Sequence, residues 1–509
     1  MSEAEFLEIR RRKLDDFEKT GGDAFPHGFP VDASIGALRA RFDDLDIEQL
    51  DAAAETVRVA GRIVNARGHG KTSFADISDG SGRIQLYVRR DEIGEAPYAA
   101  WQDLDLGDFV GVEGTLMRTR SGELTVKVAA YTLLAKALRP LPEKWHGLKD
   151  TELRYRRRYL DLAANEEVRE VFRKRAAALR ALRAHLDSSG FIEVETPIMQ
   201  PQYGGALARP FTTHHNALDL DLYLRIAPEL YLKRLLVGGL ERVYELNRNF
   251  RNEGISTQHN PEFTMLEFYA AYWDYRDMMD FVEELLAVTV EAVLGTGEFE
   301  YQGRAVAMQR PWKRMRFADA LVEIGGVPAD LLHDEKGLRG WLQERDVPAA
   351  DLGLGYMWDA ALGRFVQPEL ISPTFITHFP RDVSPFAKAC PDEEGLVERF
   401  EIYWGGLESG NGYSELNDPR EQRARMEDMA KARAAELSEQ RVDEDYIRAL
   451  EHGMPPAAGF GLGIDRLMML LTDSASIRDV ILFPLMRPRT VEEQAGEGDE
   501  NNVRGQQTH

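Results

Sequence analysis

The chain has 509 residues, of which 43% are hydrophobic and 29% are charged. Such a composition is typical of globular proteins, and the length predicts two or more domains. No apolar run reaches the roughly 18 residues that a membrane span needs, and the first residues do not resemble a secretory signal. Cys390 is the only cysteine, which excludes an intramolecular disulfide. We therefore expect a cytoplasmic protein without a membrane partner.

The net charge of −23 argues against a nonspecific coat for nucleic acid, because binding to phosphates needs a basic face. It does not exclude a local basic surface. Two clusters of basic residues occur, at 10–13 and at 154–158. Each is also consistent with a solvated helix face.

Residues 1–55 predict a helical extension, with a charged helix over about 4–19 that ends at Gly21-Gly22. The pattern then changes over 56–138 to about five short alternating strands separated by glycine turns. This predicts a small closed β-barrel of the oligonucleotide-binding (OB) kind, although an unrelated barrel or sandwich fits the pattern equally well.

Residues 139–160 predict a linker, which Pro140 and Pro142 make semi-rigid. A larger domain over 161–489 opens with an amphipathic helix that we expect Asn165 to cap and Gly190 to stop. The polar and mostly acidic residues 490–509 predict a disordered tail.

The segment 242–269 predicts two strands, over 242–254 and 262–269, joined by a loop. Alternation places Arg251 and Glu253 on one face of the first strand, and Phe263, Glu267 and Tyr269 on one face of the second. If the two faces align, a cation, two carboxylates, a phenol and an aromatic ring share one cleft. Surface salt bridges on an exposed sheet are the alternative explanation.

The segment 401–415 contains the carboxylates Glu401 and Glu408 on either side of a glycine pair. They lie on opposite faces of an ideal strand, and a bulge at the glycines would bring them together. Two carboxylates beside nucleotide phosphates suit Mg²⁺, and two solvated carboxylates are the alternative. Asn411, Tyr413 and Glu415 fall on one strand face.

The segment 459–470 has alternating glycines followed by Asp465 and Arg466. The glycines allow close approach of a backbone, Asp465 is a plausible helix cap, and Arg466 in the first helical turn can reach a polyphosphate. The pattern is not a dinucleotide fingerprint. Taken alone, the segment fits a tightly packed junction between a strand and a helix better than a phosphate site.

These segments together resemble the three signature motifs of class II aminoacyl-tRNA synthetases. The first is Gly190-Phe191-Ile192-Glu193-Val194-Glu195-Thr196-Pro197, the second contains Phe250-Arg251-Asn252-Glu253, and the third is Gly461-Leu462-Gly463-Ile464-Asp465-Arg466. Longer stretches, at 204–211, 213–219, 224–230 and 410–418, resemble the lysyl enzymes of this class. The resemblance extends over about 55–488.

The resemblance implies an α+β protein, with an N-terminal OB-fold barrel followed by a catalytic domain built on an antiparallel sheet flanked by helices. It implies activation of L-lysine with ATP, and then transfer of lysine to the 3′ end of tRNA(Lys). It also implies a homodimer formed through the first motif.

The resemblance assigns roles at the ATP site. Arg251 would hold the α-phosphate and the lysine carboxylate, Phe263 would stack on adenine, and Glu253 would meet the adenine amino group. Arg466 would hold the γ-phosphate, and Glu401 and Glu408 would bind Mg²⁺, with more than one ion expected. Arg251, Glu253 and Arg466 are thus the expected catalytic residues. The remaining expected ATP contacts are His259 and Asn260.

For lysine, the resemblance places Glu415 and Tyr269 at the ε-ammonium and Glu229 and Glu267 at the α-ammonium. The other expected lysine contacts are Gly205, Arg251, Asn411 and Tyr413. Several carboxylates in one cleft suit a substrate with two ammonium groups, whereas aspartate or asparagine would leave them buried without partners.

The barrel would read the anticodon, with Phe74 as a stacking platform and Gln85 and Glu123 at base edges. Phe74 as a core residue is equally consistent with the sequence. Three other functions compete: an aspartyl or asparaginyl enzyme, a paralogue that loads lysine onto a protein, and a catalytically silent RNA-binding paralogue. The acidic cleft argues against an aspartyl or asparaginyl enzyme, and the barrel argues against a paralogue that modifies a protein. The intact Arg251, Glu253 and Arg466 argue against a catalytically silent paralogue.

Overall fold

The structure is a computed structural model of the whole chain, and it describes residues 3–141, 148, 150–206, 208–433 and 442–488. The predicted tail at 490–509 lies outside the described residues. The contacts within the chain divide it into two compact units, one of residues 1–149 with 487–509 and one of residues 150–486.

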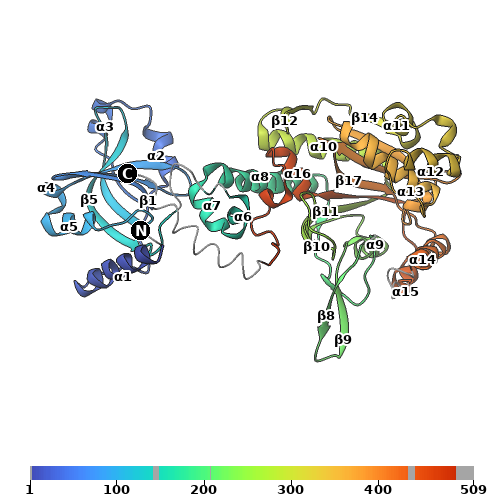
Figure 1. Cartoon of the computed structure of the whole chain (residues 1–509), viewed down its shortest axis with the longest axis horizontal. Helices are drawn as coiled ribbons and strands as arrows, with labels where there is room; N and C mark the ends of the chain where they lie inside the picture. Colours follow the sequence, from blue (N-terminus) through green and yellow to red (C-terminus); the bar gives the residue numbers. More distant parts are fainter. Residues whose placement is uncertain (1–2, 142–147, 149, 207, 434–441, 489–509) are drawn as a thin grey trace. The chain divides into compact units, whose positions relative to one another are not determined.

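Five strands of the first unit form a closed barrel in the order β1-β2-β3-β5-β4 (Figure 1). Their bounds are β1 (Thr56–His69), β2 (Thr72–Ser78), β3 (Arg83–Arg89), β4 (Phe109–Arg118) and β5 (Leu124–Ala135). Alternate side chains point inward, as in β2, where Ala75 and Ile77 are buried and Phe74 and Asp76 are not. The predicted five-stranded barrel is confirmed.

Helices cover parts of this barrel. They are α1 (Glu3–Lys19), α2 (Ile35–Phe42), α3 (Ile47–Ala53), α4 (Arg90–Ile93) and α5 (Glu95–Gln102). Ser34 caps α2, and Asp46 and Gln49 form a capping box on α3. The predicted basic cluster at 10–13 is in part structural, because buried Arg10 donates hydrogen bonds to the carbonyl oxygens of Leu106, Ala137 and Arg139.

The second unit is built on an eight-stranded sheet in the order β14-β15-β16-β17-β18-β11-β10-β6. The strands are β6 (Ile192–Glu193), β10 (Arg242–Phe250), β11 (Glu262–Ala271), β14 (Lys313–Arg316), β15 (Thr374–Pro380), β16 (Leu396–Trp404), β17 (Leu407–Ser414) and β18 (Ala457–Gly463). Pairing from β15 to β10 is antiparallel, and the two edge strands pair in parallel. The predicted antiparallel sheet is confirmed.

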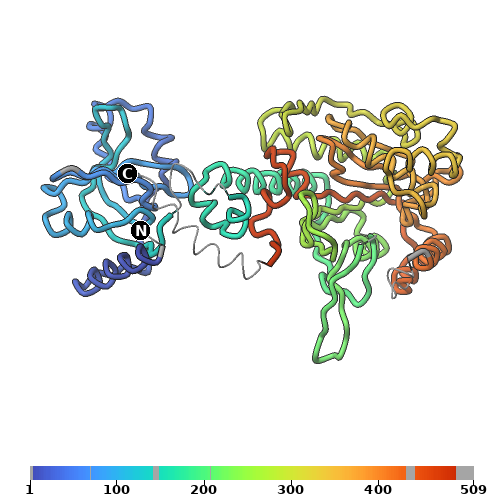
Figure 2. The backbone as a smooth tube through the Cα atoms, viewed as in Figure 1, coloured from blue at the N-terminus to red at the C-terminus, as the bar shows by residue number. Residues whose placement is uncertain are grey.

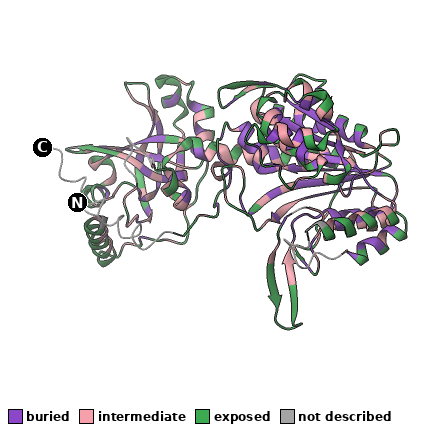
Figure 3. Cartoon of the chain, turned by 45° about the vertical axis from the view of Figure 1, so that its right-hand side comes forward, coloured by how far each residue is buried: buried purple, intermediate pink, exposed green. Residues whose placement is uncertain are grey.

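One face of this sheet packs against α8 (Glu166–Ser188), α10 (Tyr275–Leu294) and α16 (Ile464–Leu471), and this contact buries the largest apolar core. Figure 3 shows the central strands buried along most of their length. The other helices are α6 (Thr151–Arg156), α7 (Arg158–Ala164), α9 (Glu229–Val237), α11 (Phe317–Glu323), α12 (Glu335–Gln343), α13 (Leu354–Ala361), α14 (Pro419–Arg433), α15 (Glu444–Glu451) and α17 (Ile477–Val480).

Two smaller sheets complete the second unit. One pairs β12 (Glu298–Tyr301) with β13 (Arg304–Ala307), and the other has the order β7-β9-β8. The strands of the latter are β7 (Met199–Gln200), β8 (Phe211–His215) and β9 (Leu220–Leu224). Figure 1 shows the β8–β9 hairpin extending away from the large sheet.

The start of the second unit differs from the predicted linker at 139–160. The helices α6 and α7 belong to this unit, and the contacts divide the chain after Lys149. The cause is Arg158, which is fully buried and donates hydrogen bonds to the carbonyl oxygens of Arg478, Ile481 and Leu482. Figure 2 shows the C-terminal segment, in red, returning to the helices at 151–188.

Helix α8 starts at Glu166, as predicted, but the side chain of Asn165 does not cap it. The Asn165 amide instead donates a 2.6 Å hydrogen bond to Asp161. Gly190 follows the end of the helix with a φ of 81°, which favours glycine. In the described part of the chain, no helix is both long and apolar enough to cross a membrane.

Candidate active site

Two neighbouring pockets lie on the face of the large sheet formed by β11, β17 and β18. The residues that line the first pocket include Arg251, Glu253, His259, Asn260, Phe263, Glu408, Asp465 and Arg466. Those that line the second include Gly205, Glu229, Glu267, Tyr269, Phe386, Arg399 and Tyr413. The pockets share four residues, Arg251, Met265, Asn411 and Gly461, and therefore adjoin each other.

Strand β11 presents Phe263, Glu267 and Tyr269 to the pockets from one face, as predicted. The glycines of β18 lie directly opposite: Gly461 pairs with Glu267, and Gly459 pairs with Tyr269. A Cβ atom at residue 459 would lie 2.3 Å from Cε1 of Tyr269. The alternating glycines therefore leave the space that the functional side chains of β11 fill.

Arg251 and Glu253 do not lie on a strand face, because β10 ends at Phe250 and the predicted strand to 254 is too long. The Arg251 N–H still donates a 2.8 Å hydrogen bond to the Pro261 carbonyl oxygen, the next position in the register, but Pro261 has no N–H to return it and the ladder ends there. Both side chains nevertheless line the first pocket. The Arg251 guanidinium carbon lies 5.0 Å from the ring centre of Phe263, and burial lowers the pKa of Arg251.

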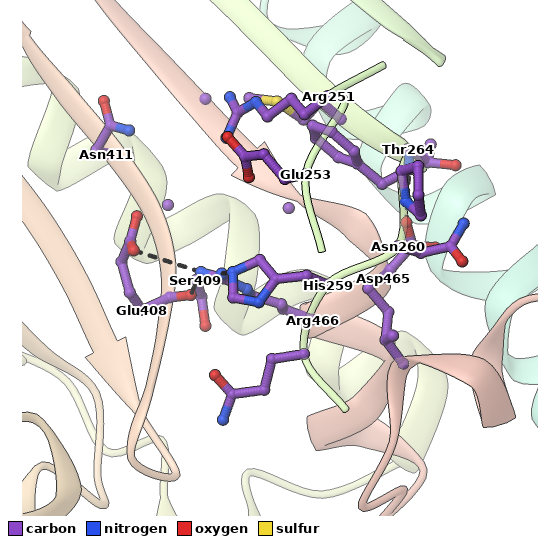
Figure 4. Close-up of a pocket in the computed structure, with 18 of the residues that line it drawn as sticks. Arg251, Glu253, His259, Asn260, Thr264, Glu408, Ser409, Asn411, Asp465 and Arg466 are labelled. Carbon is purple, nitrogen blue, oxygen red and sulfur yellow. Dashed lines mark hydrogen bonds and ion pairs between the residues drawn. The ribbon is translucent and has the colours of Figure 1, made fainter. Parts of the chain in front are cut away.

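Arg466 lies in the first turn of α16, as predicted, and faces the same pocket. Its Nη1 donates a 2.7 Å hydrogen bond to the Glu408 carbonyl oxygen, and its Nη2 lies 3.2 Å from Nε2 of His259. Figure 4 shows Arg251 and Glu253 next to each other, with His259 and Arg466 across the pocket from them. Burial, together with the charge of Arg466, lowers the pKa of His259. The neutral imidazole therefore lies beside a cation.

Asp465 is not the helix cap that the sequence predicted, because Gly463 occupies the N-cap position. Its buried carboxylate accepts a 2.8 Å hydrogen bond from the Thr264 N–H and pairs with Arg175 of α8 at 2.7 Å. Asp465 thus joins α16, β11 and α8 and sets the start of α16, from which Arg466 projects.

Glu401 and Glu408 belong to two strands of a hairpin, β16 and β17, and not to one strand. The glycine pair forms the turn, since Gly405 and Gly406 have φ values of 58° and 76°. A register shift lies after Ile402, and Glu408 pairs with Tyr403 beyond it. A bulge therefore exists, but it leaves Ser409 of β17 without a partner in β16 and does not lie at the glycines.

Only one of the two carboxylates lines a pocket. Glu408 lines the first pocket, whereas Glu401 is buried and accepts hydrogen bonds from Arg399 and from the Tyr403 hydroxyl. Burial raises the pKa of Glu401 to about 7, and the charge of Glu408 adds to the rise. Within the described residues, no group of three or more His, Cys, Asp or Glu side chains is arranged to hold a metal ion.

The second pocket is acidic. Buried Glu229, at the start of α9, accepts a 2.7 Å hydrogen bond from the Tyr413 hydroxyl. Glu267 is also buried and accepts a 3.1 Å hydrogen bond from the Tyr269 hydroxyl. Burial and the charge of Glu229 raise the pKa of Glu267 to about 8. Gly205 lies against Glu229, and a Cβ atom there would come within 3.0 Å of the Glu229 Cβ.

Glu415 lies just beyond β17, is buried, and is absent from the described lining of both pockets. Its Oε2 pairs at 2.5 Å with Nζ of Lys233, a residue that the sequence analysis did not single out. Lys233 follows Glu229 by four residues in the sequence, and this spacing is typical of an ordinary ion pair on a helix surface. The spacing alone therefore did not single out Lys233. The sequence did contain a signal that Lys233 is buried, since Lys233 lies among the apolar positions Leu230, Leu232 and Leu236 of α9.

The residues predicted to read an anticodon gather on the outside of the barrel. Phe74 is half-buried on the outer face of β2 and stacks on Tyr87 with ring centres 4.8 Å apart, so it is not part of the core. Gln85 lies on the same face, and its Oε1 accepts a 3.2 Å hydrogen bond from Thr125. Glu123 precedes β5, and Nη1 of Arg39 lies 3.4 Å from its carboxylate.

Comparison with known families agrees with this geometry. The family described as tRNA synthetases class II (D, K and N) matches residues 150–487, and the family described as OB-fold nucleic acid binding domain matches residues 57–134. The chain belongs to the class II tRNA synthetases. As a class II tRNA synthetase it is an enzyme of the ligase type, and its OB-fold barrel precedes the catalytic unit.

Relatives of this synthetase are similar over nearly their whole length. The chain is 52% identical to a lysine–tRNA ligase of Carboxydothermus hydrogenoformans over 95% of this chain and 98% of the relative. It is 50% identical to one of Moorella thermoacetica, over 96% and 99%, and 49% identical to one of Coxiella burnetii, over 95% and 98%.

Proposed function

We propose that this synthetase is a lysine–tRNA ligase, which activates L-lysine with ATP and transfers the lysyl group to the 3′ end of tRNA(Lys). The observation that carries the proposal is the position of Arg251, which lines both pockets where they adjoin. A guanidinium there can hold the carboxylate of an amino acid in one pocket and the α-phosphate of a nucleotide in the other. The similarity to lysine–tRNA ligases supports the same function.

The second pocket suits lysine by its charge. Glu229 and Glu267 line it, and both are buried. Glu229 pairs with Lys233, whereas burial of the Glu267 carboxylate is unfavourable, and the raised pKa of Glu267 expresses that cost. The two ammonium groups of lysine supply the missing positive charge. Aspartate would add a further carboxylate to the same pocket, and we therefore propose lysine and not aspartate or asparagine.

Activation needs no general base, because the carboxylate of lysine is already a nucleophile. One carboxylate oxygen attacks the α-phosphorus of ATP, the bond from this phosphorus to the bridging oxygen breaks, and pyrophosphate leaves. Arg251 stabilises the charge on the α-phosphate, and Arg466 holds the γ-phosphate end of the nucleotide. Catalysis then consists of alignment and charge stabilisation.

Phe263, Glu253, His259 and Asn260 complete the proposed nucleotide site. The ring of Phe263 lines the first pocket and offers a face for adenine, and the guanidinium of Arg251 lies 5.0 Å from its centre. Glu253 is exposed to the pocket and can accept a hydrogen bond from the adenine amino group. Because burial disfavours a charge on His259, its imidazole can act as a neutral hydrogen-bonding group.

Glu401 and Glu408 fit a site for Mg²⁺. Burial raises the pKa of Glu401 and the charge of Glu408 adds to the rise, and a divalent cation would favour the charged form of Glu401. Two protein carboxylates are also the number that Mg²⁺ commonly uses when phosphates and water complete its shell. When bound, Mg²⁺ would neutralise charge on the phosphates of ATP, and we propose more than one ion.

The outer face of the barrel is the proposed anticodon site. Phe74 presents a ring that is only half-buried, and Arg67 lies over it at 5.6 Å, which gives a stacking surface with a positive charge beside it. Gln85 and Glu123 can read base edges. We also propose that the enzyme acts in the cytoplasm and forms a homodimer through the segment 190–197, where Ile192 is 51% exposed.

Exchange of labelled pyrophosphate into ATP, measured with each of the twenty amino acids in turn, tests the proposed activity. We expect exchange with lysine and only background exchange with aspartate, asparagine and arginine. The reaction needs no tRNA, so it reports on the catalytic unit alone. Exchange with aspartate equal to that with lysine would reject the proposal.

A further inference from the structure

The lysine pocket has a second layer of charge behind its wall. Lys233 of α9 is fully buried, and its Nζ lies 2.5 Å from Oε1 of Glu229 and 2.5 Å from Oε2 of Glu415. The rings of Phe386 and Tyr413 flank it, with centres 5.0 and 5.3 Å from Nζ. Glu229 therefore faces the pocket on one side and the ammonium of Lys233 on the other.

A buried lysine is not explained by stability. Taking an ammonium out of water is costly, and replacing a buried ion pair by apolar residues of similar volume is often neutral or stabilising. The ammonium nevertheless remains charged, because the carboxylates of Glu229 and Glu415 raise the pKa of Lys233 in spite of its burial. A charged group retained at such a position points to a role in specificity.

The charges around the pocket can be counted among the described residues. Glu229, Glu267 and Glu415 contribute three carboxyl groups, and Lys233 contributes one ammonium group, which contacts Glu229 and Glu415. The pocket also contains Arg399, which is neutralised by Glu401, and Arg251, which is available for the carboxylate of the substrate. Three carboxyl groups therefore face one ammonium, which leaves two carboxyl groups for the two ammonium groups of a lysine molecule.

We propose that Lys233 is a specificity-determining residue of the lysine pocket, which neutralises one of three carboxylates and holds Glu229 and Glu415 in place for a substrate with two ammonium groups. This inference rests on the proposed function. Lys233 lies behind the pocket wall and acts through the two glutamates, so it is a positioning residue and not a catalytic one.

The state of Glu415 shows what the loss of Lys233 would change. Burial raises the pKa of Glu415 to about 8, and the charge of Lys233 opposes that rise. Without Lys233, the charge that opposes this rise would be lost, and the pKa of Glu415 would rise further. The other titratable or charged groups that face this cluster are Glu267 and Tyr269 of β11, Tyr413 of β17, Tyr446 of α15, Arg234 of α9, and Arg251.

Lysine-dependent pyrophosphate exchange by the full chain tests the role of this residue. For Lys233→Met we expect the KM for lysine to rise at least tenfold at pH 7, and the rise to become smaller toward pH 9. The KM for ATP should stay within twofold. Lys136→Met is the matched control, because Lys136 is a buried lysine between two carboxylates, Asp105 at 2.5 Å and Asp108 at 2.8 Å, in the barrel unit.

The control should lower the melting temperature and leave the KM for lysine within twofold. A Lys233→Met enzyme that also keeps its KM for lysine within twofold at pH 7 would show that Lys233 is merely structural. If Lys233→Met does not fold, a second comparison decides. Glu415→Gln leaves one carboxyl group in excess of the Lys233 ammonium, and adding Lys233→Met to it restores two.

We therefore expect the double variant to have a KM for lysine at least fivefold lower than that of Glu415→Gln alone. An equal or higher KM in the double variant would overturn the inference. Pyrophosphate exchange by the wild-type enzyme shows whether a failure concerns the role of Lys233 or the proposed function. Absence of lysine-dependent exchange in the wild type would reject the proposed function, whereas failed rescue with an active wild type rejects only the role of Lys233.

Discussion

Arg466 reaches across the first pocket to Glu408, and its Nη1 donates a 2.7 Å hydrogen bond to the backbone carbonyl oxygen of that residue. The same nitrogen lies 3.4 Å from Oε2 of the Glu408 side chain. A guanidinium held by these contacts needs no rearrangement before it meets a phosphate. The third-motif arginine and a proposed Mg²⁺ ligand therefore form one unit, even though they lie 58 positions apart in the sequence.

Arg466→Ala should lower lysine-dependent pyrophosphate exchange by about 10²–10³, the loss typical for removal of one preorganised group that stabilises charge in the transition state. Binding of tRNA, measured on filters, should stay within twofold because the barrel is unchanged. Arg420→Ala is a suitable control, since this exposed arginine pairs with Asp418 two residues away. Equal losses in both variants would contradict the role of Arg466.

Binding of lysine should depend on pH through Glu267. Burial and the charge of Glu229 raise the pKa of Glu267 to about 8 in the empty pocket, and a bound ammonium favours the charged carboxylate and lowers that pKa. Below about pH 8, binding must therefore release a proton, so the affinity falls as the pH falls. The limit is about tenfold per pH unit for one proton.

Titration calorimetry at pH 7 in two buffers with different ionisation enthalpies measures this proton release. The observed enthalpy of lysine binding should differ between the buffers, and Glu267→Gln should bind lysine more weakly and lose the difference. An enthalpy for the wild type that is independent of the buffer would show that Glu267 is already charged in the empty pocket.

The sequence predicted the faces of regular strands well and the ends of strands poorly. Alternation correctly placed Phe263, Glu267 and Tyr269 together, because β11 is regular over its whole length. It extended β10 too far, because Pro261 accepts the bond from the Arg251 N–H but has no N–H to continue the ladder. It also missed the hairpin at Gly405-Gly406, although a Gly-Gly pair between two strand patterns is a hairpin signal.

The positions of two other residues, Phe74 and Lys233, depend on long-range contacts that the sequence pattern does not encode. Whether Phe74 lies in the core or on the outer face depends on the register between β2 and its neighbours, and the structure places it outside. The role of Lys233 depends on Glu415, which is distant in sequence and reaches it only in the folded protein. A single lysine on an apolar helix face indicates a buried partner but does not identify it.

Gly459 should tolerate no side chain. A Cβ atom there would lie 2.4 Å from Oε1 of Glu415 and 2.3 Å from Cε1 of Tyr269, so Gly459→Ala must displace groups of the lysine pocket. We expect the KM for lysine to rise at least tenfold, with the KM for ATP changed much less. The control is Gly340→Ala in α12, where a Cβ atom would meet nothing within 4 Å. A lysine KM unchanged by Gly459→Ala would place the substrate elsewhere.

Phe74→Ala should separate the barrel from the catalytic unit. Stacking of an aromatic side chain on a base contributes about 1–3 kcal/mol, so charging of tRNA should fall roughly tenfold to a hundredfold. Lysine-dependent exchange without tRNA should stay near the wild-type rate, because Phe74 lies on the outer face of the barrel and not in its core. Val126→Ala is the matched core change, since Val126 is fully buried in β5.

The Val126 variant should lower the melting temperature of the barrel, whereas Phe74→Ala should change it little beyond the loss of the stack with Tyr87. Rates of charging and exchange, measured together with thermal unfolding, distinguish the two changes. A large drop in exchange for Phe74→Ala, or unfolding as severe as that of the core variant, would mean that this ring supports the fold. Phe74 would then have no place in the proposed anticodon site, and the reading of bases would have to rest on Gln85 and Glu123 alone.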